Sequence, residues 1–212
     1  MLRSLLFPDV CLGCGLLLRP QAPATLPLCL RCTAEHEPLP PGAVERDRIW
    51  AVHAYGGPLL RALHRLKFHG QPAWAGPLGA SLCASPVLTR GWDAWIPIPL
   101  HPGRLRTRGY NQAALLARHA RRHLPAPRPA LRPRWLRRIR PTAPQHRLPA
   151  EARRHNLHGA FEVLRPERLR GRRILLVDDV TTTGATFRAA REALEAAGAA
   201  EVGALALLRT LA

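Results

Sequence analysis

Two adjacent carboxylates followed by a run of hydroxyl and small residues form the part of this sequence best suited to bind a phosphorylated ligand. The acids, Asp178 and Asp179, follow the apolar residues 174–177, which predict a buried strand, and they precede a helix expected over 187–198. Backbone N–H groups at the start of such a helix, its dipole and the intervening threonine hydroxyls favour an anion. The acids repel each other and need partners, which an ordinary strand and turn would not supply. The segment predicts a phosphate site, and one unlike a Walker loop because no Gly-Lys-Thr/Ser follows.

A basic loop is predicted after the strand expected over 94–100. Three arginines alternate toward a glycine, and a polar pair then opens a helix; these residues are Arg104, Arg106, Arg108, Gly109, Asn111 and Gln112. Fixed guanidinium forks bind pyrophosphate oxygens, and a glycine lets the backbone come close to a ligand. Ligands of parallel sheets bind at the carboxyl ends of the strands, so we expect this loop to lie near the paired acids. The alternative is a solvated basic loop.

Four cysteines near the N-terminus have the spacing of a metal site. They form two CxxC pairs, Cys11 with Cys14 and Cys29 with Cys32. Two such knuckles supply a tetrahedral zinc site of four thiolates, and a site filled by four cysteines is structural rather than catalytic. Two disulfides or a redox pair are the alternatives, although the prolines of the spacer do not suit the βαβ context of a redox motif. The remaining Cys83 is expected to be a buried core thiol.

Alternating strand and helix patterns predict the fold class. Strands are expected over 49–55, 94–100, 135–140, 173–177 and 201–209, and helices over 59–68, 74–85, 111–123 and 187–198. This order is typical of an α/β protein with a mostly parallel sheet flanked by helices. A proline-rich stretch at 38–42 marks the end of the cysteine module, so we expect two domains, residues 1–47 and 48–212.

The chain is strongly basic. Its 212 residues include 32 lysines and arginines against 14 acids, a formal charge of +18, while 47% are hydrophobic and can form a core. This charge favours polyanionic partners, either nucleic acid or phosphorylated small molecules, unless it reflects a compositional preference for arginine. An arginine-rich strip around one tryptophan is typical of single-stranded nucleic acid binding, or else of a solvated loop. Its members are Arg132, Arg134, Trp135, Arg137, Arg138 and Arg140.

Lys67 is the only lysine of the chain and lies at the end of the helix expected over 59–68. The rest of the chain uses arginine, so a retained lysine suggests a point charge near a substrate. A solvated helix end explains it equally well.

Together these motifs resemble one family along nearly the whole chain. In order they are the four-cysteine module, Leu66-Lys67-Phe68-x-Gly70, Arg108-Gly109-Tyr110-Asn111-Gln112, Thr142-x-x-Gln145-x-x-Leu148, Arg153-x-x-Asn156 and Val177-Asp178-Asp179. This order is similar to that of the ComF (ComFC, GntX-like) competence family. The acid and threonine segment resembles the phosphoribosyl-pyrophosphate (PRPP) motif of type I phosphoribosyltransferases. The resemblance implies a type I phosphoribosyltransferase fold with an N-terminal zinc finger.

The resemblance also implies roles for individual residues. Asp178 and Asp179 would accept hydrogen bonds from the ribose hydroxyls. The 5′-phosphate would be held by Thr181, Thr182, Thr183, Gly184, Ala185 and Thr186. Arg104, Arg106 and Arg108, with Mg²⁺, would stabilise the departing pyrophosphate, and PRPP would also contact Gly109, Asn111 and Gln112. The cluster from Thr142 to Leu148, which continues to Arg153, Asn156 and residues 159–161, would be a flexible loop that closes over PRPP; an ordinary surface loop is the alternative.

Family members are linked to natural transformation, in which they handle incoming single-stranded DNA at the inner face of the cytoplasmic membrane. The resemblance therefore implies a PRPP-binding protein of DNA uptake, with helicase or recombination-mediator partners. An active phosphoribosyltransferase on an unidentified acceptor and a PRPP-sensing DNA-binding regulator are the alternatives. No apolar run is long enough to span a membrane, and residues 5–7 are too few for a signal-peptide core, so we expect a cytoplasmic protein.

Overall fold

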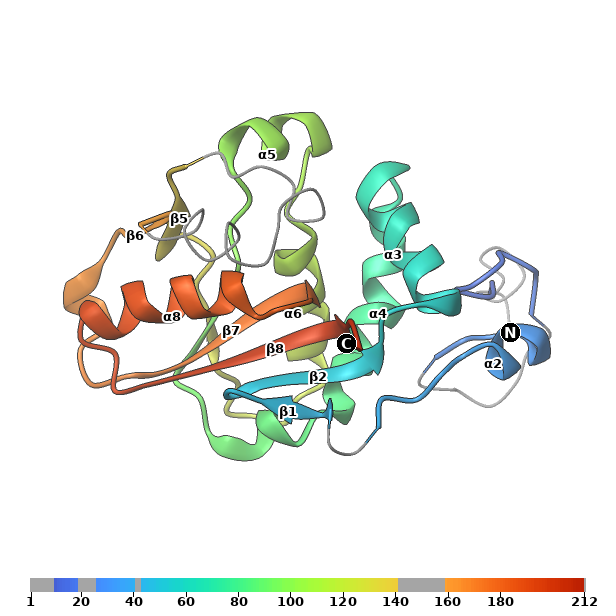
Figure 1. Cartoon of the computed structure of the whole chain (residues 1–212), viewed down its shortest axis with the longest axis horizontal. Coiled ribbons are helices and arrows are strands. Elements are labelled where there is room, and N and C mark those ends of the chain that lie inside the picture. Colours follow the sequence, from blue (N-terminus) through green and yellow to red (C-terminus); the bar gives the residue numbers. More distant parts are fainter. Residues whose placement is uncertain (1–9, 19–25, 41–42, 141–158, 212) are drawn as a thin grey trace.

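A six-stranded sheet forms the centre of the molecule (Figure 1). The structure, a computed structural model, describes residues 10–18, 26–40, 43–140 and 159–211. Across the sheet the strands are β1 (Glu45–Arg46), β2 (Ile49–Ala54), β8 (Glu201–Arg209), β7 (Arg173–Thr181), β3 (Ala94–Pro97) and β4 (Ala130–Leu131). Every neighbouring pair is parallel except β1 with β2. The expected mostly parallel α/β sheet is therefore confirmed.

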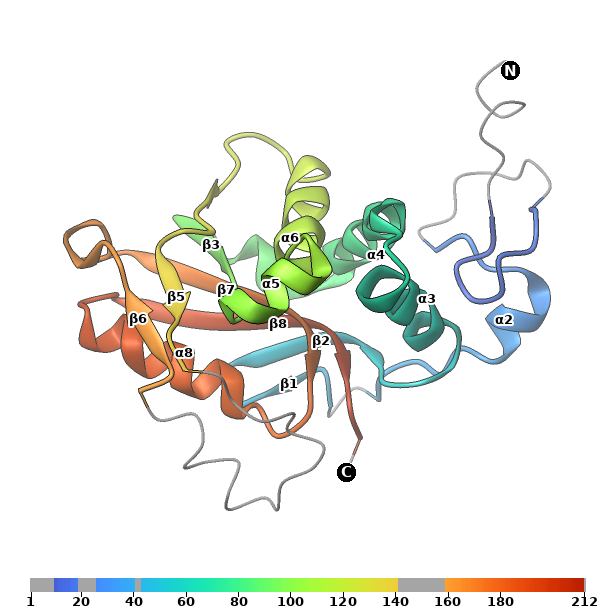
Figure 2. The same cartoon turned by 90° about the horizontal axis from the view of Figure 1, so that it is seen from above.

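Both faces of the sheet are covered, as the burial of parallel strands requires. One face carries α3 (Gly57–Phe68), α4 (Ala75–Ser81) and α6 (Gln112–Arg122). The other carries α8 (Ala185–Ala196) and an antiparallel pair, β5 (Leu136–Arg138) and β6 (Phe161–Val163) (Figure 2). Alternate residues of β7 enter the two cores, Leu175 and Val177 the first, Ile174 and Leu176 the second. The strand period of two thus fixes β7 between two apolar layers.

β7 continues beyond the predicted end at residue 177, through the two acids to Thr181. Its neighbour β8 is long enough to pair with this extension, so Asp178 lies opposite Ala206 and Thr181 opposite Arg209. The backbone of the acids is therefore held by the sheet rather than by a loop. This rigid support fixes the direction of both carboxylates.

The segment after β3 contains a helix where the sequence predicted a loop. α5 (Pro102–Arg108) has proline in its first turn, and the His101 side chain accepts a hydrogen bond from the Gly103 backbone N–H at 3.3 Å. The helix ends at Gly109, whose φ of 79° is left-handed. The loop prediction was wrong because it overlooked these start and stop signals on either side of a helix-compatible run.

The cysteine module packs against α3. Leu12 is buried in the same core as the inner side of α3. Arg61 Nε donates to the Gly13 carbonyl at 3.1 Å, and an Arg65 nitrogen donates to the Leu12 carbonyl at 3.1 Å. β1 pairs with β2, so the sheet starts before the domain boundary predicted at residue 47. The division into two domains stays a prediction.

Several shorter elements complete the chain. The helix expected over 74–85 is α4 followed by a 3₁₀ turn, Leu82–Ala84, and further 3₁₀ turns span Pro72–Trp74, Pro86–Arg90 and Pro166–Arg168. Cys83 is half-buried in the first of these turns, and its thiol donates to the Ala120 carbonyl at 3.4 Å, so it is less buried than expected. None of the described helices is both long and apolar enough to cross a membrane.

Candidate active site and metal centre

A cavity of about 1150 Å³ opens at the carboxyl ends of the central strands. It is bordered by the end of β7, the start of α8, the residues after β3, and parts of α3 and α5. Open parallel sheets place their ligands at this edge. The paired acids and the basic segment after β3 both contribute side chains to its lining. The two groups expected to lie near each other therefore share one cavity.

The paired acids meet a single cation at the end of α3. The Asp179 backbone N–H donates to Asp178 Oδ1 at 2.8 Å, and Lys67 Nζ lies 2.6 Å from Asp179 Oδ2. The side chains of Lys67 and Asp179 are only 18% and 6% exposed, so the ion pair is largely withdrawn from water. Of the two interpretations of Lys67, the structure supports the point charge at the site. Apart from the Lys67 ammonium, the buried Asp179 Oδ2 has no hydrogen-bond partner among the described residues.

The electrostatics of the pair favour a ligand that brings donors or positive charge. Burial raises the pKa of Asp178 well above its usual range, and the neighbouring charge of Asp179 raises it further. The Asp179 backbone N–H and the Lys67 ammonium oppose this rise. Sugar hydroxyls or a divalent cation would relieve the repulsion, and carboxylates are ligands that Mg²⁺ accepts. The donor set therefore fits a ribose accompanied by Mg²⁺.

The turn between β7 and α8 is shaped to receive an anion. α8 starts directly after Gly184, whose φ is 74°. This left-handed backbone favours glycine, and a Cβ atom on Gly184 would also lie 2.6 Å from Ile49 Cδ1, which would have to move. The cavity is lined here by Thr181, Thr182, Gly184, Ala185 and Thr186. Thr183 is not part of the lining, and its Oγ1 accepts from the Ala185 backbone N–H at 3.4 Å.

The helical form of α5 separates its arginines. Arg104 and Arg108 line the cavity, whereas Arg106 is exposed and outside the lining. Residues four apart share a side of a helix, and residues two apart do not. Burial lowers the pKa of Arg108, although the charges of the two acids oppose this. Arg108 donates to Gln112 Oε1 at 2.5 Å, and Gln112 also lines the cavity. The geometry therefore gives no support to the pyrophosphate role predicted for Arg106.

Gly109 and Asn111 position the elements of the site and do not line it. Asn111 Oδ1 accepts from the backbone N–H groups of Ala113 and Ala114, at 2.9 and 3.3 Å, at the start of α6. Its Nδ2 donates to the Ile98 carbonyl at 2.9 Å, which ties α6 to the end of β3. Neither residue is in the cavity lining, and their predicted contacts with PRPP stay a prediction. The left-handed backbone of Gly109 ends α5, and the short polar side chain of Asn111 caps the start of α6, so both residues stabilise the turn between the two helices.

Arg138 belongs to the cavity rather than to a nucleic-acid surface. It is 8% exposed and lines the cavity from β5. Burial lowers its pKa, the nearby Arg104 lowers it further, and Asp178 opposes both. Its predicted place in the arginine strip is therefore corrected. Arg138 joins Arg104 and Arg108 as a third guanidinium in the cavity lining.

The other members of the strip divide between core and surface. Trp135 is 7% exposed and packs in the core under α8, with the Arg132 guanidinium 5.5 Å from its ring centre. The ring of Trp135 faces inward, so this tryptophan is not available to the single strand expected at the strip. Arg137 pairs with Glu162 at 2.5 Å on the exposed side of β5. Arg132, Arg134, Arg137 and Arg140 stay accessible to solvent.

Residues 141–158 of the segment predicted to close over the ligand lie outside the described residues, and they include Thr142, Gln145, Leu148, Arg153 and Asn156. The segment connects β5 to β6 along the chain. These two strands form a separate antiparallel pair whose side chains pack with α8. In the described part, this unit contributes Arg138 to the cavity.

One wall of the cavity was not foreseen as a ligand surface. It consists of Tyr55, Leu60, His64 and Phe68. The first follows β2, and the others are spaced by four along α3, while Leu59, Leu63 and Leu66 face the core. The sequence did contain a signal for this surface: residues 60, 64 and 68 form a second row on α3, away from its buried leucines.

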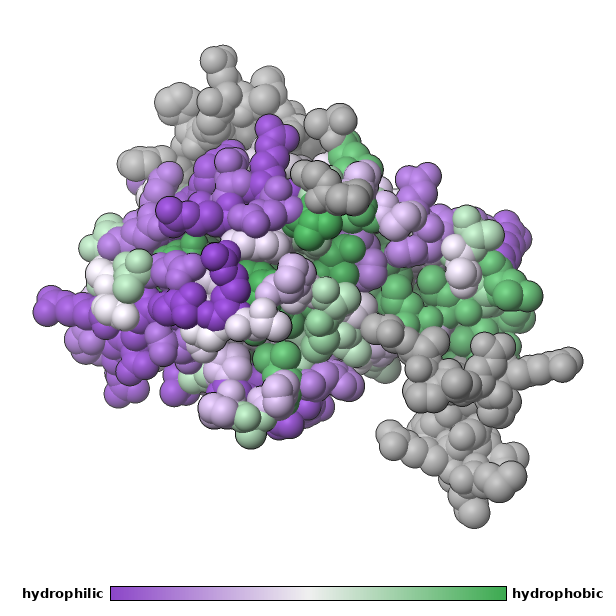
Figure 3. Space-filling view, turned by 90° about the horizontal axis from the view of Figure 1, so that it is seen from below, coloured by the Kyte–Doolittle hydropathy of each residue, from purple (hydrophilic) through white to green (hydrophobic). Residues whose placement is uncertain are grey.

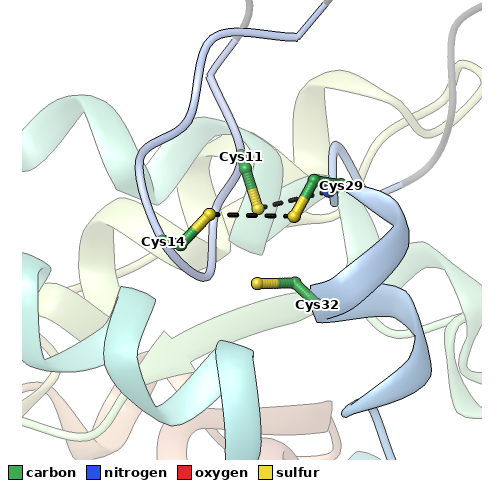
Figure 4. Close-up of side chains that lie close together, drawn as sticks. All are labelled: Cys11, Cys14, Cys29 and Cys32. Carbon is green, nitrogen blue, oxygen red and sulfur yellow. Dashed lines mark hydrogen bonds between the residues drawn. The ribbon is translucent and has the colours of Figure 1, made fainter.

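The four predicted metal ligands come together beside α3 (Figure 4). Cys11 and Cys14 lie on a turn, Cys29 precedes α2 (Leu30–Ala34), and Cys32 lies within it. All four sulfur atoms lie within 4.8 Å of one another. The Cys14 and Cys29 sulfurs are 3.7 Å apart. A tetrahedron with zinc–sulfur bonds of ~2.3 Å has edges of about that length.

The surroundings of the cysteines also suit a cation. A Cβ atom on Gly13 would lie 2.6 Å from Cys32 Sγ, so glycine is needed for the knuckle to close. Burial works to raise the pKa of Cys11, yet surrounding backbone N–H groups lower it to about 6. Burial and neighbouring thiols raise the pKa of Cys32 to about 12. Four thiolates this close need a shared positive charge, so the donor set fits a structural zinc ion.

Similarity to known proteins points to the same type of protein as the geometry of the cavity. Residues 114–212 match the family model described as phosphoribosyl transferase domain, a range that contains β7 and the acids. The chain is 33% identical over 209 residues to DNA utilization protein YhgH of Salmonella typhimurium, covering 96% of this chain and 85% of the relative. Identity to the protein of the same name from Escherichia coli O157:H7 is 34% over 212 residues, covering 95% and 85%.

A third relative carries a different name. Competence protein F of Haemophilus influenzae is 37% identical over 171 residues, covering 77% of this chain and 73% of the relative. These matches run through the cysteine module as well as the sheet, since two of them cover almost the entire chain. The chain therefore belongs to the ComF-like phosphoribosyltransferase family.

Proposed function

We propose that this protein binds PRPP together with Mg²⁺ in the cavity and acts on incoming single-stranded DNA in a competence pathway. One observation carries the proposal: the paired acids, the threonine turn and the guanidinium groups of Arg104 and Arg108 line the same cavity. The names of the relatives, DNA utilization protein and competence protein, support the cellular role. The expected helicase or recombination partners and a location at the inner membrane face stay predictions.

Each part of the cavity would hold one part of PRPP. Asp178 and Asp179 accept hydrogen bonds from the ribose hydroxyls and orient the sugar, and they do not act as nucleophiles. The turn before α8 takes the 5′-phosphate on backbone N–H groups and threonine hydroxyls. Arg104, Arg108 and Arg138 face the pyrophosphate. Mg²⁺, when bound, neutralises pyrophosphate charge and makes its departure easier.

Calorimetry with PRPP and Mg²⁺ tests the binding site. The zinc-loaded wild type should bind, and an Asp178→Asn/Asp179→Asn variant should lose at least about tenfold in affinity, because two charge-assisted hydrogen-bond acceptors are lost. Glu192→Gln, at an exposed position of α8, removes one carboxylate charge away from the cavity and should leave affinity unchanged. Equal binding by the wild type and the double variant would refute the assignment.

Turnover is a separate question from binding. In a transferase reaction, a nucleophile displaces pyrophosphate from C1 of the ribose through an oxocarbenium-like state, and the arginines bind the pyrophosphate more strongly as its charge grows. Pyrophosphate should then appear only when PRPP and an acceptor are both present. PRPP binding without pyrophosphate release across an acceptor screen would assign PRPP the role of an effector.

A further inference from the structure

The side of α3 that faces the cysteine module carries two arginines. Arg61 and Arg65 are four residues apart and so share one side of the helix. Arg65 Nη1 donates to the backbone carbonyls of Leu12 and Gly13, at 3.1 and 3.3 Å. Arg61 Nε also donates to the Gly13 carbonyl, at 3.1 Å. These contacts dock the first knuckle on α3, a structural role that the two arginines share.

Arg61 makes a further contact that docking does not need. Its Nη2 donates to the sulfur of Cys32 at 3.6 Å, and Cys32 is one of the four cysteines of the cluster (Figure 4). The same nitrogen lies 2.6 Å from Glu35 Oε2, at the end of α2. The second oxygen of this carboxylate accepts from Arg31 Nε at 3.0 Å. Glu35 therefore holds the Arg61 guanidinium against the sulfur.

Charge explains why a cysteine cluster benefits from such a donor. Four thiolates around one divalent ion leave a net negative charge on the metal centre. An N–H group that donates to a thiolate offsets part of this charge and fixes the orientation of the ligand. The Cys29 backbone N–H makes a contact of this kind with the Cys11 sulfur, at 3.2 Å. Arg61 is the corresponding donor to Cys32, and it brings a full positive charge.

The ion pair between Arg61 and Glu35 does not by itself account for the arrangement. The two side chains are 46% and 34% exposed, and ion pairs this accessible to water contribute little to stability. The Cys32 side of the contact is different, because Cys32 is only 1% exposed. The effect of Arg61 is therefore expected at the buried sulfur rather than in the stability of the surface.

We propose that Arg61 belongs to the metal centre as the outer-sphere partner of Cys32, and that it slows the loss of zinc. Arg61 acts through the Cys32 sulfur and is thus a positioning residue for the metal ligand. Glu35 orients it from the other side. The metal centre is in this way completed by a residue of α3, so zinc retention depends on the contact between the module and this helix. The proposal concerns the four-cysteine site and is independent of PRPP binding.

The rate of zinc release from the full chain tests the proposal. Zinc-loaded protein is mixed with an excess of a chelator whose zinc complex is coloured, and release is followed by absorbance. Arg61→Gln should release zinc about tenfold faster than the wild type, as expected for the loss of an outer-sphere partner. Arg61→Lys should lie between the two, because it keeps the charge and loses the planar fork. Arg31→Gln, which removes an 86% exposed charge that pairs with Glu35, should release zinc at the wild-type rate.

Arg65→Gln separates the contact with sulfur from docking. It removes carbonyl contacts with the same knuckle, so it should lower the Tm at least as much as Arg61→Gln and yet release zinc more slowly than Arg61→Gln. Co²⁺ in place of zinc supplies a second readout, because its near-ultraviolet absorption arises from charge transfer from the sulfurs. Arg61→Gln should shift this absorption, and Arg65→Gln should leave it at the wild-type position.

Equal release rates for Arg61→Gln and Arg65→Gln, with identical cobalt spectra, would overturn the proposal, and so would a wild-type chain that binds no zinc. If Arg61→Gln does not fold, Arg61→Lys and Glu35→Gln take its place. Both should release zinc faster than the wild type, since one loses the fork and the other the carboxylate that orients it. Wild-type release rates in both variants would refute the role of Arg61.

Discussion

At the residue scale, the candidate site places two adjacent carboxylates against a single ammonium group. Asp178 and Asp179 lie at the end of one strand and contact one ammonium group, that of Lys67. Arg108 and Arg138 interact with the charge of the acids, and Arg104 lines the same cavity, which favours a ligand with both anionic groups and hydroxyl donors. Repulsion between neighbouring carboxylates destabilises the ligand-free fold and is relieved by binding. Functional residues of this kind trade stability for affinity.

Asp178→Asn should therefore stabilise the ligand-free protein. Because the fold raises the pKa of Asp178, the folded state binds a proton more readily than the unfolded state, and stability from this group falls as pH rises above about 4. The variant removes this effect, so we expect its Tm to exceed that of the wild type by a few degrees at neutral pH and to match it near pH 4. Thermal unfolding across this range measures the difference. A variant that is less stable at neutral pH would contradict the repulsion.

At the element scale, a chain of side chains joins the end of the cysteine module to the sheet. His36 Nε2 lies 3.3 Å from His53 Nδ1 in β2, and His53 Nε2 lies 3.1 Å from Ser81 Oγ in α4. Ser81 donates its own proton to the Leu78 carbonyl at 2.8 Å. Ser81 then accepts from His53, so Nε2 of His53 carries a proton. Burial, with a smaller contribution from the charge of His36, lowers the pKa of His53 to about 4, which keeps the imidazole neutral at neutral pH.

This histidine predicts a loss of stability in mild acid. The unfolded chain takes up a proton at His53 near pH 6.5 whereas the fold resists until about 4, so stability falls as pH drops through that window. The full effect is about 3 kcal/mol. In His53→Gln, this part of the acid dependence should disappear from urea unfolding curves. His123→Gln, at an exposed position, should retain the wild-type dependence. Identical curves for wild type and His53→Gln would rule out the assignment.

At the scale of the whole molecule, the cysteine module and the cavity share α3. One side of this helix binds the knuckle through Arg61 and Arg65, and its end carries Lys67 and Phe68, which line the cavity. Loss of order in the module therefore affects the position of the helix that reaches the acids. A small module of this kind depends on its metal for folding.

Zinc removal should lower the thermal stability of the whole protein. Metal analysis should give one zinc per chain, and chelation should lower the Tm by at least several degrees because the docking of Leu12 and Gly13 on α3 is lost. Cys32→Ser should behave like the chelated protein, whereas Cys83→Ser should keep both its zinc and its Tm. A Tm that does not respond to chelation would show that the module is independent of the sheet.

Charge on the outer surface is also a property of the whole molecule. Figure 3 shows hydrophilic side chains gathered over the end that carries α8, and more hydrophobic surface toward the end that carries the cysteine module. Four arginines of the predicted strip, Arg132, Arg134, Arg137 and Arg140, are exposed, although Arg137 pairs with Glu162. Phosphate contacts from such residues give binding that depends on salt and not on sequence.

Single-strand affinity should consequently fall steeply with added salt. Arg134→Ala/Arg140→Ala should make the slope of log affinity against log salt less steep by about one to two, as expected for two lost phosphate contacts. The control variant Arg46→Ala/Arg170→Ala removes the same charge at other exposed positions and should change the slope less. A flat salt response of the wild type would exclude strand binding by this surface.

Much of the fold and part of the site could be predicted from local patterns. Each of three confirmed features was signalled by a pattern only a few residues long. These patterns are the apolar run before Asp178, the glycine at the end of α8 and the CxxC spacing. The helix α5 was missed because a basic run seemed to require a loop, although proline and glycine flanked it as they flank helices. Periodicity along the chain was otherwise sufficient to indicate an α/β sheet.

The sequence by itself determined which residue types are present and which neighbours share an element: the adjacent acids, the threonine turn and the paired cysteines. Only the tertiary structure decided which side chains meet across elements. It brought Lys67 to Asp179, turned Arg138 into the cavity, buried Trp135 and left Arg106 outside. Local spacing follows from backbone geometry, whereas these contacts depend on the packing of two apolar layers against one sheet, which no short stretch of sequence encodes.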